Sequence, residues 1–98
     1  MKEVYVVNCC RTAIGSFGGS LKDTPAAEMG ATVIKEALSR AGVKPEQVDE
    51  VMFGCILTAG LGQNVARQCA RKAGIPISVP AYTVGLVCGS GMKSVIEG

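Results

Sequence analysis

Three short apolar runs, rich in β-branched residues, stand out along the chain. They cover residues 3–8, 48–57 and 77–87, and each has the length and composition of a strand buried on both faces. Segments rich in glycine or proline separate these runs from their neighbours. Residues 11–25 therefore predict a long loop, and residues 59–63 predict a second, glycine-rich loop.

Between and after these runs, the apolar positions recur every three or four residues, which is typical of a helix with one buried face. This spacing predicts a helix over residues 26–41, ended by Gly42, and a shorter helix over residues 64–73 with Asn64 as its N-cap. A third helix is expected over residues 90–97. The order strand, helix, strand, helix, strand, helix indicates an α/β fold with a mostly parallel sheet.

The composition narrows the function classes. Hydrophobic residues make up 48% and charged residues 18% of the chain, which favours a folded core over disorder because ordinary domains carry roughly 25% charged residues. The net charge of +2 is scattered and aromatic residues are only 4%, so no nucleic-acid partner is expected. The longest uncharged stretch, residues 73–92, is interrupted by prolines and glycines, and the first apolar run is too short for a signal peptide. We therefore expect no membrane association and a cytosolic location.

Five cysteines accompany a complete lack of histidine. The odd number, the absence of a C-x-x-C pair and the lack of histidine argue against a disulfide framework and against a zinc site. Four of the cysteines are interpreted as small buried hydrophobic residues: Cys9, Cys10, Cys55 and Cys69. The missing histidine also excludes an imidazole base within these 98 residues.

The glycine-rich segments do not form a nucleotide-binding motif. Residues 60–65 and 89–94 begin like a dinucleotide fingerprint, but both lack its third glycine. Met92 stands where a phosphate-binding loop needs glycine before its lysine. No permanently bound cofactor is expected.

Cys88 is the candidate catalytic residue. It lies in the sequence Val-Cys-Gly-Ser-Gly, between a predicted strand and a predicted helix, the position of a nucleophile elbow. A thiol at a helix N-terminus faces the positive end of the helix dipole, which favours the thiolate, and the free N–H groups there stabilise a developing oxyanion. From these residues alone, a core cysteine before a glycine-rich helix start is an equally good interpretation.

Four segments, in order, carry a resemblance to a known family: residues 11–19 (Arg-Thr-Ala-Ile-Gly-Ser-Phe-Gly-Gly), 43–46, 59–68 and 87–91. Together they resemble the thiolases, particularly bacterial acetyl-CoA acetyltransferases, along the whole chain. The resemblance implies that residues 1–98 are a partial amino-terminal domain of a layered α/β/α fold. The remainder of that domain and a carboxy-terminal domain are expected to lie outside this sequence.

The resemblance also implies a reaction. Cys88 matches the nucleophile that takes an acyl group from a coenzyme A thioester, with its own N–H as one oxyanion donor. The family condenses two acetyl-CoA molecules to acetoacetyl-CoA, or cleaves the product in the reverse thiolysis, as part of fatty acid metabolism. Coenzyme A thioesters are thus the expected substrates, and the expected partner is a second copy of the chain or a complementing carboxy-terminal thiolase chain.

The family's catalytic histidines, its second cysteine and an asparagine-held water come from its carboxy-terminal half, so this chain alone is expected to be inactive. Gly85 and Leu86 replace a polar pair that is usual in close relatives, and Asn8, Cys9 and Cys10 replace small and aliphatic residues. These differences suit a diverged or decayed copy. Two alternatives stand beside the thiolase interpretation. One is a non-catalytic relic or oligomerising fragment of a thiolase, and the other is a related ketoacyl synthase that uses acyl-carrier protein.

Overall fold

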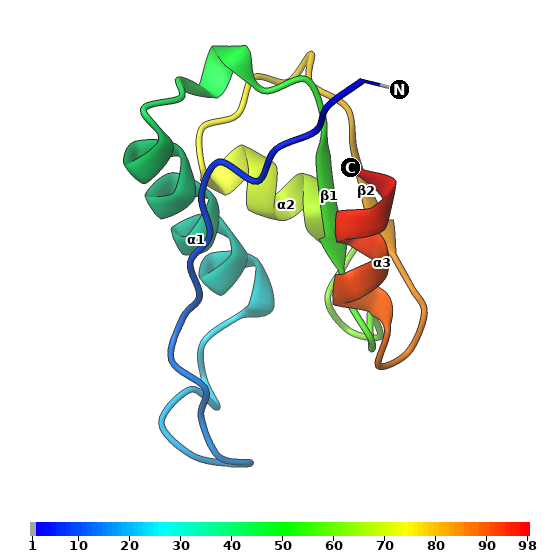
Figure 1. Ribbon diagram of the computed structural model, residues 1–98. Coiled ribbons are helices and arrows are strands. Elements are labelled where there is room, and N and C mark those ends of the chain that lie inside the picture. The colour runs from blue at the N-terminus through cyan, green and yellow to red at the C-terminus, as the bar shows by residue number, and fades with distance from the viewer. Residues whose placement is uncertain (1) are drawn as a thin grey trace.

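The computed structural model describes residues 2–98 and contains a small parallel sheet between helices (Figure 1). Its elements, in chain order, are α1 (Ala26–Ala41), the 3-10 helix η1 (Pro45–Gln47), β1 (Val51–Gly54), α2 (Val65–Lys72), β2 (Ala81–Val84) and α3 (Ser90–Glu97). The two strands run parallel, with Val51 opposite Ala81 and Gly54 opposite Val84. This confirms the α/β class and the parallel sheet.

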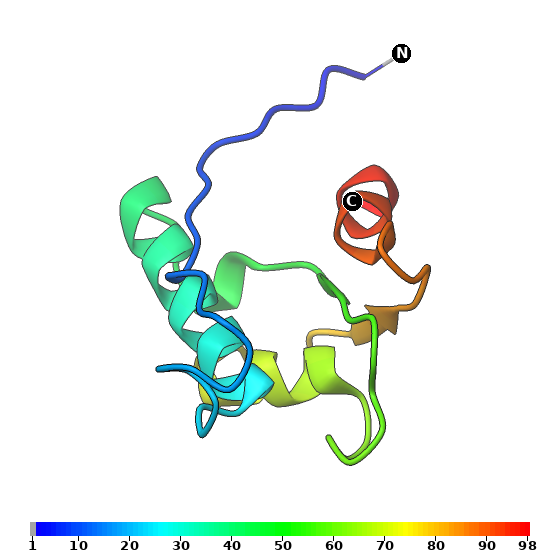
Figure 2. The same cartoon turned by 90° about the horizontal axis from the view of Figure 1, so that it is seen from below.

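The helices form layers on the two sides of this sheet. Helices α2 and α3 both pack against β1 and β2, from opposite faces, and α1 lies against α2 (Figure 2). The carboxyl ends of both strands therefore lie near the N-terminus of α3. This layering is the part of the expected α/β/α arrangement that residues 2–98 contain.

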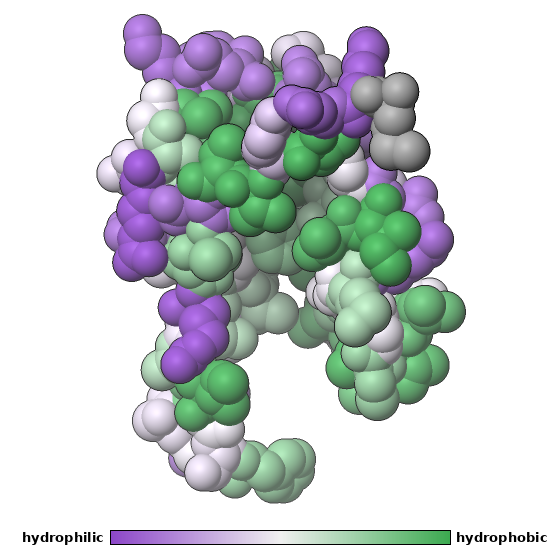
Figure 3. All heavy atoms as spheres, viewed as in Figure 1, coloured by the Kyte–Doolittle hydropathy of each residue, from purple (hydrophilic) through white to green (hydrophobic). Residues whose placement is uncertain are grey.

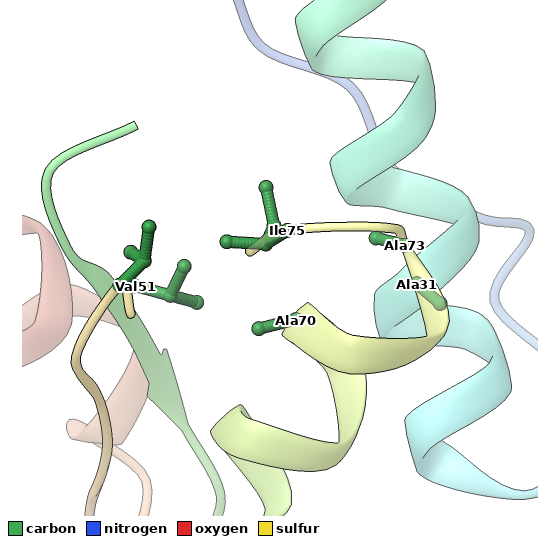
Figure 4. Packing of buried hydrophobic residues seen from close by; sticks show 6 residues of the cluster. Ala31, Val51, Ala70, Ala73 and Ile75 are labelled. Atoms are coloured by element: carbon green, nitrogen blue, oxygen red, sulfur yellow. The ribbon is translucent and has the colours of Figure 1, made fainter. Parts of the chain in front are cut away.

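The core is small and is built largely from alanine. Ile75 and Ala70 are completely buried and belong to one cluster with Val51 of β1, and Ala73 lies beside Ala31 of α1 in the same cluster (Figure 4). Small side chains let α1 and α2 approach closely. Helix contact is closest at Gly30, where a Cβ atom would collide with Sγ of Cys69 and lie 3.2 Å from its Cβ.

Local signals set the helix ends as predicted. Gly42 ends α1 with a φ of 66°, a left-handed conformation that suits glycine, and Val43 N–H donates to the Leu38 carbonyl across this cap. Asn64 starts α2, because its Oδ1 accepts a hydrogen bond from Arg67 N–H at 3.0 Å. The prediction of three helices is confirmed.

The strand predicted over residues 3–8 is wrong. These residues are extended but form no strand with any partner in the described chain, and the side chains of Val4, Tyr5, Val6 and Val7 are 71% to 83% exposed. A strand requires a neighbouring backbone to accept and donate its hydrogen bonds. Residues 3–8 have no such neighbour in the described chain, because β1 pairs with β2. The apolar side chains of this segment and of α3 remain on the surface, as Figure 3 shows.

The other two strands are shorter than predicted. The run over residues 48–57 forms only four residues of strand, and so does the run over residues 77–87. Pro80 directly precedes β2, and the chain turns immediately after Val84. Most of their side chains are half-buried rather than buried, since the sheet has only two strands.

The interpretation of four buried cysteines holds only for Cys69, which is 1% exposed. Cys10 and Cys55 are half-buried, and Cys9 is exposed. Cys9 and Cys10 belong to the extended N-terminal segment, which packs against no sheet. All five cysteines are free thiols.

Candidate functional site

The candidate site is the turn between β2 and α3, residues 85–89, which we call the elbow turn. Cys88 lies in it and is exposed. Two backbone hydrogen bonds close the turn, from Gly89 N–H to the Leu86 carbonyl at 2.9 Å and from Ser90 N–H to the Val87 carbonyl at 3.2 Å. The predicted strand-to-helix position of Cys88 is therefore confirmed, whereas its role as nucleophile stays a prediction.

The residue before Cys88 adopts a strained backbone conformation. Val87 has a φ of 45°, a left-handed conformation that is a genuine outlier for a β-branched residue. Such strain costs on the order of 1–3 kcal/mol and persists only where the surroundings impose it. The chain thus bends sharply one residue before the thiol, and Cys88 is displayed beyond the end of β2.

Ser90 holds this bend in place. Its side chain is buried, with only 1% exposure. Its Oγ accepts a hydrogen bond from Leu86 N–H at 2.8 Å and donates one to the Val87 carbonyl at 2.7 Å. One hydroxyl therefore connects the first turn of α3 to both residues that precede Cys88.

Gly54, the last residue of β1, fixes where α3 begins. A Cβ atom at Gly54 would lie only 2.5 Å from the Gly91 amide nitrogen and from the Ser90 carbonyl oxygen. Only glycine allows the start of the helix to rest directly on the strand. The carboxyl end of the sheet and the N-terminus of α3 therefore meet next to the elbow turn.

The first turn of α3 contains backbone N–H groups without a backbone acceptor in residues 2–98. Lys93 N–H donates to the Gly89 carbonyl at 2.8 Å, but within residues 2–98 the amides of Gly91 and Met92 have no backbone acceptor, as is usual in a first helical turn. No atom from outside α3 lies within 4 Å of the Cβ position of Gly91 in the described chain. The Gly91 amide nitrogen packs against Gly54, whereas the space at the Cβ position of Gly91 is clear. These N–H groups are the donors that the first turn of a helix can offer to an anion.

No second catalytic group joins Cys88 in this chain. The sequence contains no histidine, and within residues 2–98 no three Cys, Asp or Glu side chains gather into a possible metal site. No helix in the same residues has both the length and the apolar character of a membrane span. Within residues 2–98 the site supplies a thiol and backbone donors, and it contains no imidazole base.

The sequence did not reveal two features of this site. Gly54 and Ser90 position the elbow turn, yet each is an unremarkable residue in its own segment. For Gly54 one sequence signal was available, because a glycine within an apolar strand often marks a place where another backbone segment approaches closely. A cavity of about 550 Å³ lies elsewhere, between residues 10–12 and α1, and Cys88 does not line it. No pattern in the sequence predicted this cavity.

Comparison with known proteins places the chain in a family. Residues 4–98 match the family model described as "Thiolase, N-terminal domain". The chain is 60% identical over 94 residues to an acetyl-CoA acetyltransferase of Syntrophomonas wolfei, covering 96% of this chain and 24% of the relative. An acetyl-CoA acetyltransferase of Cupriavidus necator is 62% identical over 96 residues, with coverage of 98% and 24%.

Two further matches differ in length. An acetyl-CoA acetyltransferase of Clostridioides difficile is 53% identical over 94 residues, which cover 96% of this chain and 88% of the relative. The crystal structure of Acat5 thiolase from Ascaris suum in complex with coenzyme A superposes with a TM-score of 0.96 at 40% identity, covering 99% of this chain and 25% of that one. The chain thus spans about a quarter of the length of the Syntrophomonas and Cupriavidus relatives.

Proposed function

This chain belongs to the thiolase family, and from that premise we propose that it carries the acyl-accepting cysteine of an acetyl-CoA acetyltransferase. Cys88 is the acceptor. The complete reaction condenses two acetyl-CoA molecules to acetoacetyl-CoA and coenzyme A, or runs in the reverse direction as thiolysis. Splitting the reaction through a thioester suits cysteine, which is both a good nucleophile and a good leaving group.

The reaction has two halves, acetyl transfer to Cys88 and condensation with a second acetyl-CoA. In each half, one bond to the acetyl carbonyl carbon forms and one breaks. The Cys88 thiolate attacks the thioester carbonyl of acetyl-CoA, and collapse of the tetrahedral intermediate expels coenzyme A thiolate and leaves acetyl-Cys88. A base then removes the α-proton of a second acetyl-CoA. Its enolate carbon attacks the acetyl carbonyl, and the Cys88 thiolate departs with the electron pair of the C–S bond.

The observation that carries this proposal is the exposed Cys88 thiol in the elbow turn, directly before the free amides of α3. An oxyanion formed on attack by Cys88 develops within reach of the Cys88 backbone N–H, which we assign as one oxyanion donor. Backbone donors held by a rigid turn need no reorganisation as charge develops. Ser90 and Gly54 supply that rigidity.

The resemblance assigns the base and the acid to histidines and a second cysteine of the family's carboxy-terminal half, and this chain has no histidine. We propose that a carboxy-terminal thiolase segment supplies them, and that the active assembly is a complex with such a segment or an oligomer containing it. The substrates are coenzyme A thioesters, with no permanently bound cofactor. The matched relatives are named acetyl-CoA acetyltransferases, and the Ascaris thiolase is in complex with coenzyme A. A cytosolic location and a place in fatty acid metabolism belong to the same proposal.

A second candidate function is a non-catalytic, oligomerising module. It is favoured by the apolar side chains left exposed on the elbow turn and α3: Leu86, Val87, Met92, Val95 and Ile96. Burial of such a surface favours association through the hydrophobic effect, offset by the entropy lost when two chains bind. Under this function a complex forms without acyl transfer. The match to the thiolase model favours both candidates over a ketoacyl synthase.

The deciding experiment is acetyl transfer followed by mass spectrometry of the cysteine peptides. The chain is mixed with acetyl-CoA, with and without the carboxy-terminal three quarters of the Cupriavidus necator relative. The proposal expects acetylation of Cys88 in the complemented sample, its loss in Cys88→Ser and its retention in Cys55→Ser. Acetyl groups spread evenly over the five cysteines contradict the role of Cys88, whereas a stable complex without acetylation supports the oligomerising module.

A further inference from the structure

A second site lies away from the elbow turn, between the extended N-terminal segment and the outer side of α1. The cavity there has a volume of about 550 Å³, within the range of small-molecule pockets, which is roughly 300–1,000 Å³. One wall is residues 10–12, and the opposite wall is the side of α1 that includes Thr32, Val33 and Ser39. Nothing in the proposed acyl transfer uses this cavity.

The charge of the cavity is positive. Arg11, Lys35 and Arg40 line it together with one carboxylate, Glu36. Glu36 already forms an ion pair with Arg40 at 2.7 Å, which leaves Arg11 and Lys35 without a carboxylate partner in the described chain. A pocket lined by an excess of one charge concentrates ligands of the opposite charge.

Cys10 places a thiol in the wall of this positive cavity. It is half-buried, and its Sγ lies 3.3 Å from the Val33 carbonyl oxygen of α1, to which it donates. The pKa of the Arg40 guanidinium is raised, first by its hydrogen bond to Glu36 and by the charge of Glu36, and to a lesser extent by the charges of Cys10 and Cys9. Cys10 and the basic side chains thus line the same cavity, whereas Cys9 is exposed and lies outside its lining.

We propose that Cys10 is a modification site that takes a low-molecular-weight anionic disulfide, held in this cavity by Arg11 and Lys35. The Cys10 thiol gives its proton to solvent, and the thiolate attacks one sulfur of the disulfide. A Cys10–S–S–R bond forms, the original S–S bond breaks, and RS⁻ leaves with its electron pair. The disulfide is the oxidant, and Cys10 and one half of the reagent share the new mixed disulfide.

The test compares anionic and neutral disulfides on the 98-residue chain. Glutathione disulfide and coenzyme A disulfide are the anionic probes, and hydroxyethyl disulfide is the neutral one. Two matched variants isolate the neighbouring thiols: Cys9→Ser leaves Cys10, and Cys10→Ser leaves Cys9. Because Cys55, Cys69 and Cys88 remain in both variants, the rate of mixed disulfide formation at Cys10 or Cys9 is followed by peptide mapping, and intact mass gives the total number of adducts.

The expected result is a ratio of Cys10 to Cys9 rates that is about tenfold higher with an anionic disulfide than with the neutral one. The excess falls in 1 M salt, where charges are screened within about 3 Å, and in Lys35→Gln. The faster of the two anionic probes, glutathione disulfide or coenzyme A disulfide, shows which class of disulfide the cavity prefers. The proposal is overturned if the ratio of Cys10 to Cys9 rates is the same for neutral and anionic disulfides. It is also overturned if the higher ratio with anionic disulfides persists in 8 M urea, because in the unfolded chain that preference arises from the adjacent Arg11 alone.

Discussion

Gly54 and Ser90 lie in direct backbone contact, with no room for a side chain between them. Gly54 ends β1 and Ser90 begins α3, so this contact joins the sheet to the helix that follows Cys88. The position of the thiol therefore depends on a residue 34 positions earlier in the chain.

Replacing Gly54 by alanine is expected to lower the free energy of unfolding by about 1–3 kcal/mol, the usual cost of overpacking, because the new Cβ collides with the Ser90 carbonyl. Urea denaturation measures this loss. Gly91→Ala is the matched control, since no atom from outside α3 lies within 4 Å of its Cβ position in the described chain. Alanine there is expected to stabilise α3 slightly. Equal effects at the two glycines would contradict the contact.

Replacing Ser90 by alanine is expected to loosen the elbow turn. The change removes the hydrogen bonds to Leu86 N–H and the Val87 carbonyl, and unsatisfied buried groups cost about 1–3 kcal/mol. Without this hydroxyl, Val87 is freer to leave its strained conformation. Urea denaturation measures the stability.

The position of Cys88 in this variant is read from the rate at which iodoacetamide labels it. Ser94→Ala serves as the control, because Ser94 is only half-buried and its Oγ donates to the Gly91 carbonyl within α3. We expect Ser90→Ala to change the labelling rate and Ser94→Ala to leave it unchanged. A stable Ser90→Ala protein with unchanged labelling would show that the turn holds its shape without the hydroxyl.

The contact of α1 with α2 predicts a coupling between Gly30 and Cys69. Gly30→Ala alone is expected to destabilise the protein by about 1–3 kcal/mol, since its Cβ collides with the Cys69 sulfur. Cys69→Ala removes that sulfur, so the double variant should lose less stability than the two single variants added together. A double-mutant cycle measures the difference, and strict additivity would argue against the close packing.

Burial of Cys69 predicts a dependence of stability on alkaline pH. Burial raises the pKa of this thiol above its usual value, so the folded state favours the neutral thiol. The stabilisation is complete below the pKa of the unfolded thiol, about 8.5, and is lost as pH rises through the folded pKa. The free energy of unfolding should therefore decrease from pH 8 to pH 10.

Denaturation at several pH values checks this dependence, and Cys69→Ala should make the decrease smaller. Cys9→Ala is the control because Cys9 is exposed. Burial and nearby carboxylates raise the pKa of Tyr82, and a hydrogen bond to Glu3 raises that of Tyr5. Both tyrosines therefore add to the decrease near pH 10, equally in the parent chain and in Cys69→Ala. An undiminished slope in Cys69→Ala would exclude the thiol as its source.

The sequence predicted those parts of the fold that depend on local interactions. Gly42 and Asn64 mark helix ends because each satisfies backbone groups a few residues away, and the apolar spacing of α1 needs only its own residues. Residues 3–8 could not be placed in the same way, since a strand exists only with a partner. Their composition is that of a strand, but in residues 2–98 they have no neighbour to pair with.

The candidate site was predictable only in outline. The order of an apolar run, a cysteine and a glycine-rich helix start placed Cys88 in a turn, and the structure agrees. The conformation of Val87 and the support from Gly54 and Ser90 depend on contacts between distant segments. The cavity beside Cys10 was equally hidden, because it arises where the N-terminal segment passes over α1.

The exposed run Val4–Val7 has a practical consequence for handling the chain in solution. Its backbone N–H and C=O groups have no strand partner among residues 2–98, and its side chains are β-branched or aromatic. A segment of this kind is a template for intermolecular sheet formation and aggregation. Aggregation should therefore increase steeply with protein concentration, and a lysine in place of Val6 is the simplest substitution to counter it.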